Sequence, residues 1–258
     1  MDLGLDGQRV IVSGATRGIG LAIARRFARE GANVLVTGRG ASDLKTAVQL
    51  IEADAPAIQA LAVAGDMTGR DGVLAACEAA ERAWGGLDVA VANVGSGSWP
   101  ALFEATERDW ATALEINLLA AVELARAVVP GMQARRRGAF LAIASIAGLE
   151  AMPAPLPYVA AKSALLAFSK NLARSVAADG VRVNVLSPGN VLVPGGAWAR
   201  RLDADAARTT AYIESEVPMR RFGRPEEIAD VAVFACSDRA SFVTGACLVA
   251  DGGQTRGW

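Results

Sequence analysis

Tyr158 and Lys162 lie four residues apart in the segment Tyr-Val-Ala-Ala-Lys, and Ser145 lies thirteen residues before the tyrosine. On a helix this spacing places the phenol and the ammonium group on the same face. A cation close to a phenol favours the phenolate, so we expect the pKa of Tyr158 to lie well below the ~10 of a free phenol. Such a tyrosine can exchange protons with an alcohol. An ordinary amphipathic helix also produces this spacing, so the interpretation depends on what accompanies the pair.

A glycine-rich segment near the N-terminus accompanies it. Residues 13–20 read Ser-Gly-Ala-Thr-Arg-Gly-Ile-Gly, directly after an apolar run and directly before a helical pattern. Glycines permit a tight turn and let the backbone approach a pyrophosphate, while the amides and dipole of a helix N-terminus favour negative charge. This context predicts a dinucleotide site that includes Gly14, Thr16, Arg17, Gly18, Ile19 and Gly20.

The composition excludes several other kinds of site. The chain has 258 residues, 52% of them hydrophobic and 21% charged, and contains no histidine. The absence of histidine excludes His-dependent triads, His-ligated zinc and His general bases. Cys77, Cys236 and Cys247 form no close-spaced pair, which argues against thiolate-ligated zinc and suits a reducing compartment. We therefore expect no metal site.

The distribution of charge indicates neither a nucleic-acid partner nor a membrane. The net charge is -1, and basic residues are interspersed with acidic ones. The one arginine cluster, residues 135–137, precedes a predicted strand and indicates a solvated helix end. Apolar stretches are short or interrupted by charge, and the N-terminus lacks signal-peptide features, so a cytoplasmic protein is expected.

Strand-like apolar segments alternate with amphipathic helical patterns along the chain. The apolar segments are continuous, which is typical of parallel strands buried on both faces. We expect a single α/β domain, residues 1–258, with a Rossmann-like doubly wound parallel sheet of about seven strands and helices on both faces. The predicted strands are residues 10–12, 33–37, 58–64, 89–92, 139–144, 181–186 and 246–250.

Ligands of such sheets bind at the carboxyl ends of strands. Residues Gly14, Asp66, Asn93, Ser145 and Pro188 all stand at such ends of the predicted strands. Residues 190–217 form a long insertion without a predicted strand, with a short helical pattern through Ala207. Insertions of this kind in compact domains are usually functional.

Together these motifs resemble the short-chain dehydrogenase/reductase family, of the NADP(H)-dependent ketone/3-oxoacyl reductase type. The resemblance covers nearly the whole chain, because further family motifs follow in the expected order. These motifs are Asp66, where relatives hold the adenine, Asn93-Val94-Gly95, Asn117 in Glu-Ile-Asn-Leu, Pro188-Gly189 and Asp251-Gly252-Gly253.

The resemblance implies a catalytic role for four residues. Tyr158 would donate a proton to a ketone and take it back from an alcohol, while Lys162 would lower the Tyr158 pKa and hold the nicotinamide ribose. Ser145 would hydrogen-bond the carbonyl or alkoxide oxygen, and Asn117 would hold a water that links Lys162 to solvent. The cofactor site would also include Met67, Asn93, Gly95, Pro188, Gly189 and Val191. Residues 190–217 would be a substrate lid.

The end of the second strand indicates the cofactor. Relatives that prefer NAD carry an acid there, which binds the ribose hydroxyls and repels a 2′-phosphate. This chain has no acid at that point; Gly38 leaves room, and Arg39, with Arg17 in the glycine turn, could bind a phosphate. We expect NADP(H), with NAD(H) as the alternative.

Two residues depart from the family pattern. Ala92 stands where the family has the first asparagine of Asn-Asn-Ala-Gly, which removes a side chain that braces the backbone. Val193 stands where a threonine is usual, and valine cannot donate the hydroxyl hydrogen bond that relatives use near the nicotinamide and diphosphate.

The residues predicted to line the substrate pocket are mostly apolar and include no cation. They predict a neutral or hydrophobic ketone or secondary alcohol as substrate. Because Arg200 and Arg201 lie on the predicted lid, acyl-carrier or carboxylated substrates remain an alternative. The predicted lining residues are Gly95, Ser96, Trp99, Ser145, Ile146, Met152, Pro153, Leu156, Asn190, Val191 and Trp198.

The alternatives are an NAD(H)-dependent alcohol dehydrogenase, a 3-oxoacyl thioester reductase and a dinucleotide sensor without catalysis. A sugar epimerase or dehydratase of the extended relatives would need a larger C-terminal domain. The predicted helical stretches 110–133 and 158–178 carry small and apolar residues on more than one face. We expect a homotetramer, or at least a homodimer.

Overall fold

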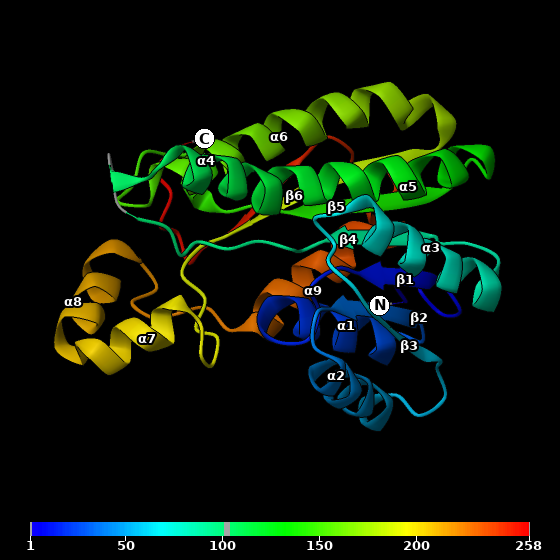
Figure 1. Ribbon diagram of the computed structural model, residues 1–258, viewed down its shortest axis with the longest axis horizontal. Helices are drawn as coiled ribbons and strands as arrows, with labels where there is room; N and C mark the ends of the chain where they lie inside the picture. The colour runs from blue at the N-terminus through cyan, green and yellow to red at the C-terminus, as the bar shows by residue number, and fades with distance from the viewer. Residues whose placement is uncertain (1, 101–103, 258) are drawn as a thin grey trace.

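The computed structural model describes residues 2–100 and 104–257, and its centre is a seven-stranded parallel sheet (Figure 1). The strand order is β3-β2-β1-β4-β5-β6-β7. Strands β1 to β3 are added toward one edge of the sheet and β4 to β7 toward the other, so the topological switch point lies between the parallel neighbours β1 and β4. The strands are β1 (Arg9–Val12), β2 (Asn33–Gly38), β3 (Ala60–Ala64), β4 (Val89–Ala92), β5 (Gly138–Ile143), β6 (Val181–Pro188) and β7 (Cys247–Ala250). The doubly wound fold predicted from the sequence is confirmed.

Two strands differ from the prediction of burial on both faces. The inner strands β1 and β4 are almost wholly buried, whereas β3 and β7 leave alternate side chains accessible, with Val249 44% exposed. These two strands are the edges of the sheet, and each pairs with one neighbour within the described chain. Strand β3 also begins at Ala60, two residues later than predicted.

Helices cover both faces of the sheet. Helices α1 (Gly18–Arg29), α2 (Ala41–Asp54) and α9 (Pro225–Cys236) pack on one face, and α3 (Arg70–Trp84), α5 (Ala120–Ala134) and α6 (Leu156–Val176) on the other (Figure 1). Successive side chains of a strand point to opposite faces. Accordingly Val10 and Val12 pack in the hydrophobic cluster under α1, α2 and α9, and Ile11 packs in the cluster under α3, α5 and α6.

Helix α4 (Glu107–Leu114) leads into α5 through a π-helical turn, Glu115–Leu119. A capping box between Thr106 and Asp109 begins α4, so the start of this helix is fixed by its own sequence. A π-helical turn inside a longer helix is often found at a functional site. This turn carries Asn117.

Residues 190–217 form two helices, α7 (Ala197–Ala204) and α8 (Ala206–Glu216), which extend beyond the carboxyl edge of the sheet (Figure 1, yellow to orange). The sequence predicted one short helical pattern through Ala207, and the structure divides this region at Asp205, whose side chain caps α8. We call residues 190–217 the lid segment. No helix in the described ranges is long and apolar enough to cross a membrane.

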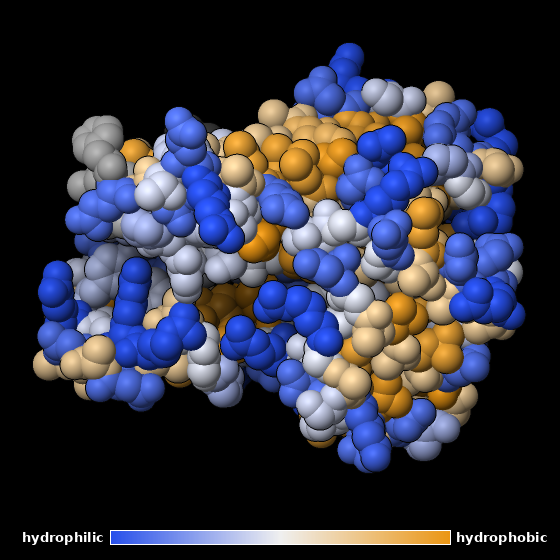
Figure 2. All heavy atoms as spheres, viewed as in Figure 1, coloured by the Kyte–Doolittle hydropathy of each residue, from blue (hydrophilic) through white to orange (hydrophobic). Residues whose placement is uncertain are grey.

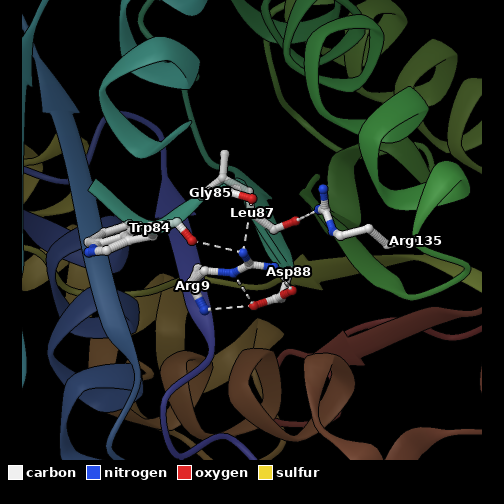
Figure 3. A network of polar contacts seen from close by, with 6 residues as sticks. All are labelled: Arg9, Trp84, Gly85, Leu87, Asp88 and Arg135. Carbon is white, nitrogen blue, oxygen red and sulfur yellow. Dashed lines mark hydrogen bonds and ion pairs between the residues drawn. The ribbon is translucent and has the colours of Figure 1, made fainter. Parts of the chain in front are cut away.

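A polar network joins β1 to β4 at the amino ends of the central strands (Figure 3). The Arg9 guanidinium donates to both carboxylate oxygens of Asp88, from Nε at 2.7 Å, and to the Trp84 carbonyl at 3.0 Å. Burial raises the pKa of the Asp88 carboxyl, but the Arg9 hydrogen bonds and the Arg9 and Arg135 charges outweigh burial and lower it. The network therefore fixes the edge of the sheet opposite to its carboxyl ends.

The arginines at the end of α5 are exposed, as predicted, and two of them also donate to backbone carbonyls of neighbouring segments. The Arg135 guanidinium donates to the Leu87 carbonyl, and that of Arg136 donates to the Ala178 carbonyl at 2.9 Å. These bonds tie the end of α5 to the segments before β4 and β6. Carbonyls in such connecting loops need donors, and these arginines provide them.

We predict that Arg9 and Asp88 are strongly coupled. Arg9→Met and Asp88→Asn should each lower the free energy of unfolding by about 1.5–3 kcal/mol, and the double substitution by much less than the sum. Urea unfolding at pH 7 measures all four corners of the cycle. Because the folded pKa of Asp88 is lowered, its contribution is present above about pH 4 and is lost as the pH falls through the folded value.

The exposed pair Arg82 and Glu78, 3.7 Å apart on α3, is the matched control. Its coupling energy should not exceed about 0.5 kcal/mol. Equal coupling in the two pairs would show that Arg9 and Asp88 do not anchor the sheet.

Candidate active site

A cavity of about 790 Å³ lies at the carboxyl edge of the sheet, beneath the lid segment. Figure 2 shows the recess between α7–α8 and the body of the molecule. The structure brings sixteen of the residues predicted from the sequence to its walls. They are Gly14, Thr16, Arg17, Gly18, Ile19, Gly20, Arg39, Asp66, Met67, Asn93, Gly95, Ser96, Tyr158, Lys162, Val191 and Trp198.

The glycine turn between β1 and α1 is shaped to approach a ligand. Gly14 and Gly18 have φ values of 63° and 57°, which favour glycine. A Cβ on Gly20 would lie 2.4 Å from the Asn93 side-chain nitrogen, so a side chain there would displace the neighbouring strand end. Helix α1 has no side-chain cap and no acid in its first turn, so its N-terminal amides remain available for an anion.

Asn93 braces this turn. Its side-chain amide donates to the carbonyls of Ser13 at 3.1 Å and Gly14 at 3.0 Å, and its backbone N–H donates to the Ser13 hydroxyl at 3.0 Å. The alanine at position 92 was expected to remove a bracing side chain. The structure shows that the turn is nevertheless braced, by the residue that follows.

The ends of β2 and β3 form one end of the cavity. Arg39 is exposed there, and its charge is close enough to lower the pKa of Asp66. The larger cause is a hydrogen bond from the Thr68 backbone, which outweighs the opposing effect of burial. Gly38 does more than leave room, because a Cβ there would lie 2.4 Å from Thr16 Cγ2. This end of the cavity thus carries an accessible guanidinium beside an ionised carboxylate.

Tyr158 and Lys162 stand in the first two turns of α6, at the end of β5. The Lys162 ammonium is buried, donates to the Ile143 carbonyl at 2.8 Å, and lies 5.9 Å from the centre of the Tyr158 ring. Burial lowers the pKa of Lys162 to about 8. The two side chains therefore meet on one helix face, as the spacing predicted.

The pKa of Tyr158 differs from the prediction. Burial raises it, and the polar interaction with the Ser145 side chain opposes that rise only in part. The sequence predicted that Lys162 would lower it, but the lysine itself is desolvated and committed to a backbone carbonyl. Tyr158 is therefore protonated at neutral pH in this form of the protein, which suits a proton donor.

Ser145 and Asn117 are not themselves among the lining residues, but their sequence neighbours Ala144 and Ile116 are, and the Ser145 side chain interacts with Tyr158, which lines the cavity. The Ser145 hydroxyl accepts the Ala147 N–H at 3.1 Å and caps the short turn after β5, while retaining its own proton to donate. The Asn117 amide exchanges hydrogen bonds with Ser96, accepting its N–H at 2.9 Å and donating to its carbonyl at 3.1 Å.

Gly95 allows these groups to come together. A Cβ at this position would lie 3.0 Å from the Asn117 side-chain oxygen and 3.2 Å from the Lys162 ammonium nitrogen. The segment after β4 therefore passes directly over the buried lysine and asparagine.

The lid segment contacts both ends of the cavity. The Val193 side chain covers the glycine turn, since a Cβ on Gly18 would lie 2.8 Å from it. Trp198 stacks on Tyr212 with 5.5 Å between ring centres and also packs against Phe222, so one face of its ring is held within the lid. The Arg200 guanidinium donates to the Ser98 hydroxyl at 3.1 Å, across the opening.

Several predicted residues lie elsewhere. Gly189 packs against Asp251, and the Asn190 amide donates to the Gln254 side chain at 2.8 Å, so neither faces the cavity. Trp99 donates to the Ser96 carbonyl at 2.8 Å and is likewise not among the lining residues. The remaining predicted residues outside the lining are Ile146, Met152, Pro153, Leu156 and Pro188.

The sequence reasoning missed a polar part of the lining. Thr112, Glu115 and Ile116 have the i, i+3, i+4 spacing of one helix face, and this signal could have identified them in the segment that leads to Asn117. The premise that no cation lines the substrate pocket is wrong, because α7 turns Arg200 into the cavity. Other lining residues that were not predicted as site residues are Gly65, Thr68, Val94, Gly97, Ser98, Ile143, Ala144, Gly196 and Ala197.

Comparisons with known proteins agree with this geometry. Residues 14–255 match the family described as enoyl-(acyl carrier protein) reductase. Dehydrogenase/reductase SDR family member 4 of Bos taurus is 35% identical over 97% of this chain and 88% of its own. Gluconate 5-dehydrogenase of Gluconobacter oxydans is 35% identical over 97% of this chain and 96% of its own.

A solved structure shares the whole fold. L-sorbose reductase from Gluconobacter frateurii, complexed with NADPH and L-sorbose, superposes over 100% of both chains with a TM-score of 0.93 and 36% identity. The matched family, the relatives and the architecture are consistent with one another and with the Tyr158–Lys162 site. The chain belongs to the short-chain dehydrogenase/reductase family and is an oxidoreductase of that family.

Proposed function

We propose that this protein transfers a hydride between NADP(H) and a ketone or secondary alcohol. The observation that carries the proposal is one continuous cavity that begins at the glycine turn and ends at Tyr158 and Lys162. A dinucleotide is long enough to join these two ends, and its nicotinamide would then meet the proton donor.

The residues present fit a dinucleotide. The free N-terminal amides of α1 and the glycine turn suit a pyrophosphate. A Cβ at Gly20 or Gly18 would clash with Asn93 or Val193, so the turn needs glycine at both positions. Asp66, ionised at the far end, suits the amino group of an adenine. Arg17 and Arg39 are both exposed on that end of the cavity and suit a 2′-phosphate, which favours NADP(H) over NAD(H).

The reaction then follows from the chain's own groups. The nicotinamide supplies or accepts the hydride when it is bound. Tyr158, protonated at neutral pH, gives its phenolic proton to the carbonyl oxygen as the substrate is reduced and regains a proton afterwards. Ser145 donates its hydroxyl hydrogen to the same oxygen and stabilises the charge that develops on it.

Lys162 sets the electrostatics of this step. As Tyr158 loses its proton, the charged ammonium 5.9 Å from the ring centre stabilises the phenolate that forms. Lys162 is also near enough to the cavity wall to hold the hydroxyls of a nicotinamide ribose. Asn117 fixes the segment over this lysine through Ser96, and we propose that it also holds a water that carries protons to Lys162.

A reductase of 3-oxoacyl thioesters is the second candidate. The 3-oxoacyl-[acyl-carrier-protein] reductase of Thermotoga maritima is 32% identical over 96% of this chain, which favours it. NADPH oxidation with simple ketones and with 3-oxoacyl thioesters separates the two. Cofactor binding without turnover of any compound in a broad panel would instead indicate a dinucleotide sensor.

We also propose that the protein is a homotetramer. Figure 2 shows hydrophobic side chains gathered over the region that Figure 1 labels α5 and α6. Leu119, the residue directly before α5, is also exposed. A second apolar surface, with exposed Phe234, Phe242 and Val249, lies around α9 and β7. Two separate apolar surfaces favour two kinds of two-fold interface, which is the arrangement of a tetramer.

We predict that Arg39→Ala weakens NADPH binding at least about tenfold more than NADH binding. The substitution removes charge-assisted hydrogen bonds of about 1.5–3 kcal/mol, which only NADPH can accept through its 2′-phosphate. Fluorescence titration of both cofactors measures the difference, and Arg39→Lys should retain part of the preference. Equal weakening of both cofactors would contradict the assignment.

We predict that Tyr158→Phe lowers kcat about 10²- to 10⁴-fold while NADPH binding and folding stay nearly unchanged. The chain has one other tyrosine, Tyr212, in the lid segment, and Tyr212→Phe is the matched control that should keep most of the activity. Retention of more than a tenth of kcat in Tyr158→Phe, with hydride transfer rate-limiting, would show that another group is the acid.

The pH dependence of reduction should follow Lys162. Its pKa is about 8, so the ammonium is charged at neutral pH and loses its charge as the pH rises through that value. The kcat/KM for ketone reduction should therefore be level near pH 7 and fall above about pH 8. A profile of initial rates from pH 6 to 10 tests this, and a rise through pH 8 would be inconsistent with it.

The tetramer should be visible as a mass of four chains in light scattering at micromolar concentration. Phe242→Glu places a charge on the second apolar surface and should yield dimers, with unchanged circular dichroism. A monomeric mass for the unaltered protein would refute the proposed assembly.

A further inference from the structure

Arg200 is the cation of the lid segment that faces the cavity. It lies on α7, one turn after the Gly195-Gly196 turn, and its guanidinium donates to the Gly195 carbonyl at 2.8 Å and to the Ser98 hydroxyl at 3.1 Å. The neighbouring Arg201 has a different environment. Its guanidinium stacks on the Trp198 ring, 4.6 Å from the ring centre, and it does not line the cavity.

The partner Ser98 places Arg200 at the reacting end of the cavity. Ser98 follows Gly97, where a Cβ would lie 3.8 Å from Cζ of the Tyr158 ring. The guanidinium is therefore held beside the segment that passes over the proton donor. Arg39 and Arg17 belong to the other end, around Asp66 and the glycine turn.

No acidic side chain in the described part of the chain neutralises Arg200. The ion pairs of that part of the structure do not include it. The two acids that line the cavity are Asp66 and Glu115; Asp66 is bound to Thr68, and Glu115 lines an adjoining cavity together with Thr68. Both acids thus lie toward the Thr68 wall, and the guanidinium beside Ser98 keeps donors that Gly195 and Ser98 do not occupy.

We propose that Arg200 binds a carboxylate of the substrate, so that the preferred substrates are ketones and secondary alcohols that carry a carboxylate a few bonds from the reacting carbon. This inference rests on the proposed function and names the substrate class of the same site. A planar guanidinium matches a carboxylate through two parallel hydrogen bonds, and Ser98 can add a third. A phosphate dianion would favour a second cation at this end, and the lysine that lines the cavity, Lys162, is buried against the Ile143 carbonyl.

The test compares oxo acids with their neutral amides of the same shape. The pairs are 4-oxopentanoate, 5-oxohexanoate and 6-oxoheptanoate against the corresponding amides, each with NADPH. The unaltered enzyme should favour the best acid over its amide at least about tenfold in kcat/KM. Arg200→Met should lower kcat/KM for that acid about 10- to 100-fold, mainly through KM, and change the amide less than about threefold.

Arg201→Met is the matched control, because it removes an adjacent guanidinium that does not face the cavity. It should leave the preference for the acid intact. Arg200→Lys, which keeps the charge and loses the planar pair of donors, should restore part of that preference. NADPH affinity, titrated separately, should be the same in all three variants.

Three results would overturn the proposal. The first is equal kcat/KM for every acid and its amide with the unaltered enzyme. The second is an equal loss of kcat/KM on acid and amide in Arg200→Met. The third is a weaker NADPH affinity in that variant, which would assign Arg200 to cofactor binding.

The outcome is distinguishable from failure of the proposed function. Reduction of any amide by the unaltered enzyme supports hydride transfer whatever Arg200 does. If no compound is reduced, calorimetry of the same acids and amides with the enzyme saturated with NADP⁺ gives the comparison without turnover. Equal affinities of acid and amide for the unaltered enzyme would then refute the carboxylate subsite. So would an acid affinity that is the same for the unaltered enzyme and for Arg200→Met.

Discussion

The hydrogen bond from the buried Lys162 ammonium to the Ile143 carbonyl is the contact on which the site depends. A buried charge is costly unless it is paired or hydrogen-bonded, so the lysine fixes α6 to the last residue of β5. The same burial lowers the pKa of Lys162 and brings Tyr158, one turn earlier, to the carboxyl edge of the sheet. One interaction therefore sets the position of the helix, the pKa of the lysine and the place of Tyr158, the proposed proton donor.

Close backbone contacts at two glycines also hold the site together. Gly95 lets the segment after β4 pass over Lys162 and Asn117, and Gly20 lets α1 meet the side chain of Asn93. Because interiors are close-packed, an added methyl at either position would separate elements that must touch. The central strands thus hold the two halves of the cavity, the glycine turn and the Tyr158 end, in one rigid frame.

The sequence predicted the features that depend on local pattern. Continuous apolar runs identified the strands, and four-residue spacing put Tyr158 and Lys162 on one face. The sequence did not predict the features that depend on tertiary contacts. Asn190 turns to Gln254, which is 64 residues away in sequence, and Arg200 reaches Ser98 from a helix whose orientation no local pattern determines. The pKa of Tyr158 likewise depends on burial, which spacing alone does not reveal.

The cavity combines a fixed half with a half that the lid segment supplies. Groups on the sheet edge are bonded to the backbone of the central strands and the glycine turn, Asn93 to Ser13 and Gly14 and the buried Lys162 to Ile143. Arg200 instead joins the cavity through a serine hydroxyl and the turn at Gly195. Enzymes commonly keep the reacting groups on rigid elements and vary specificity in loops. The proposed division of this site would follow that rule, with Tyr158 and Lys162 held at the sheet edge and Arg200 carried by α7.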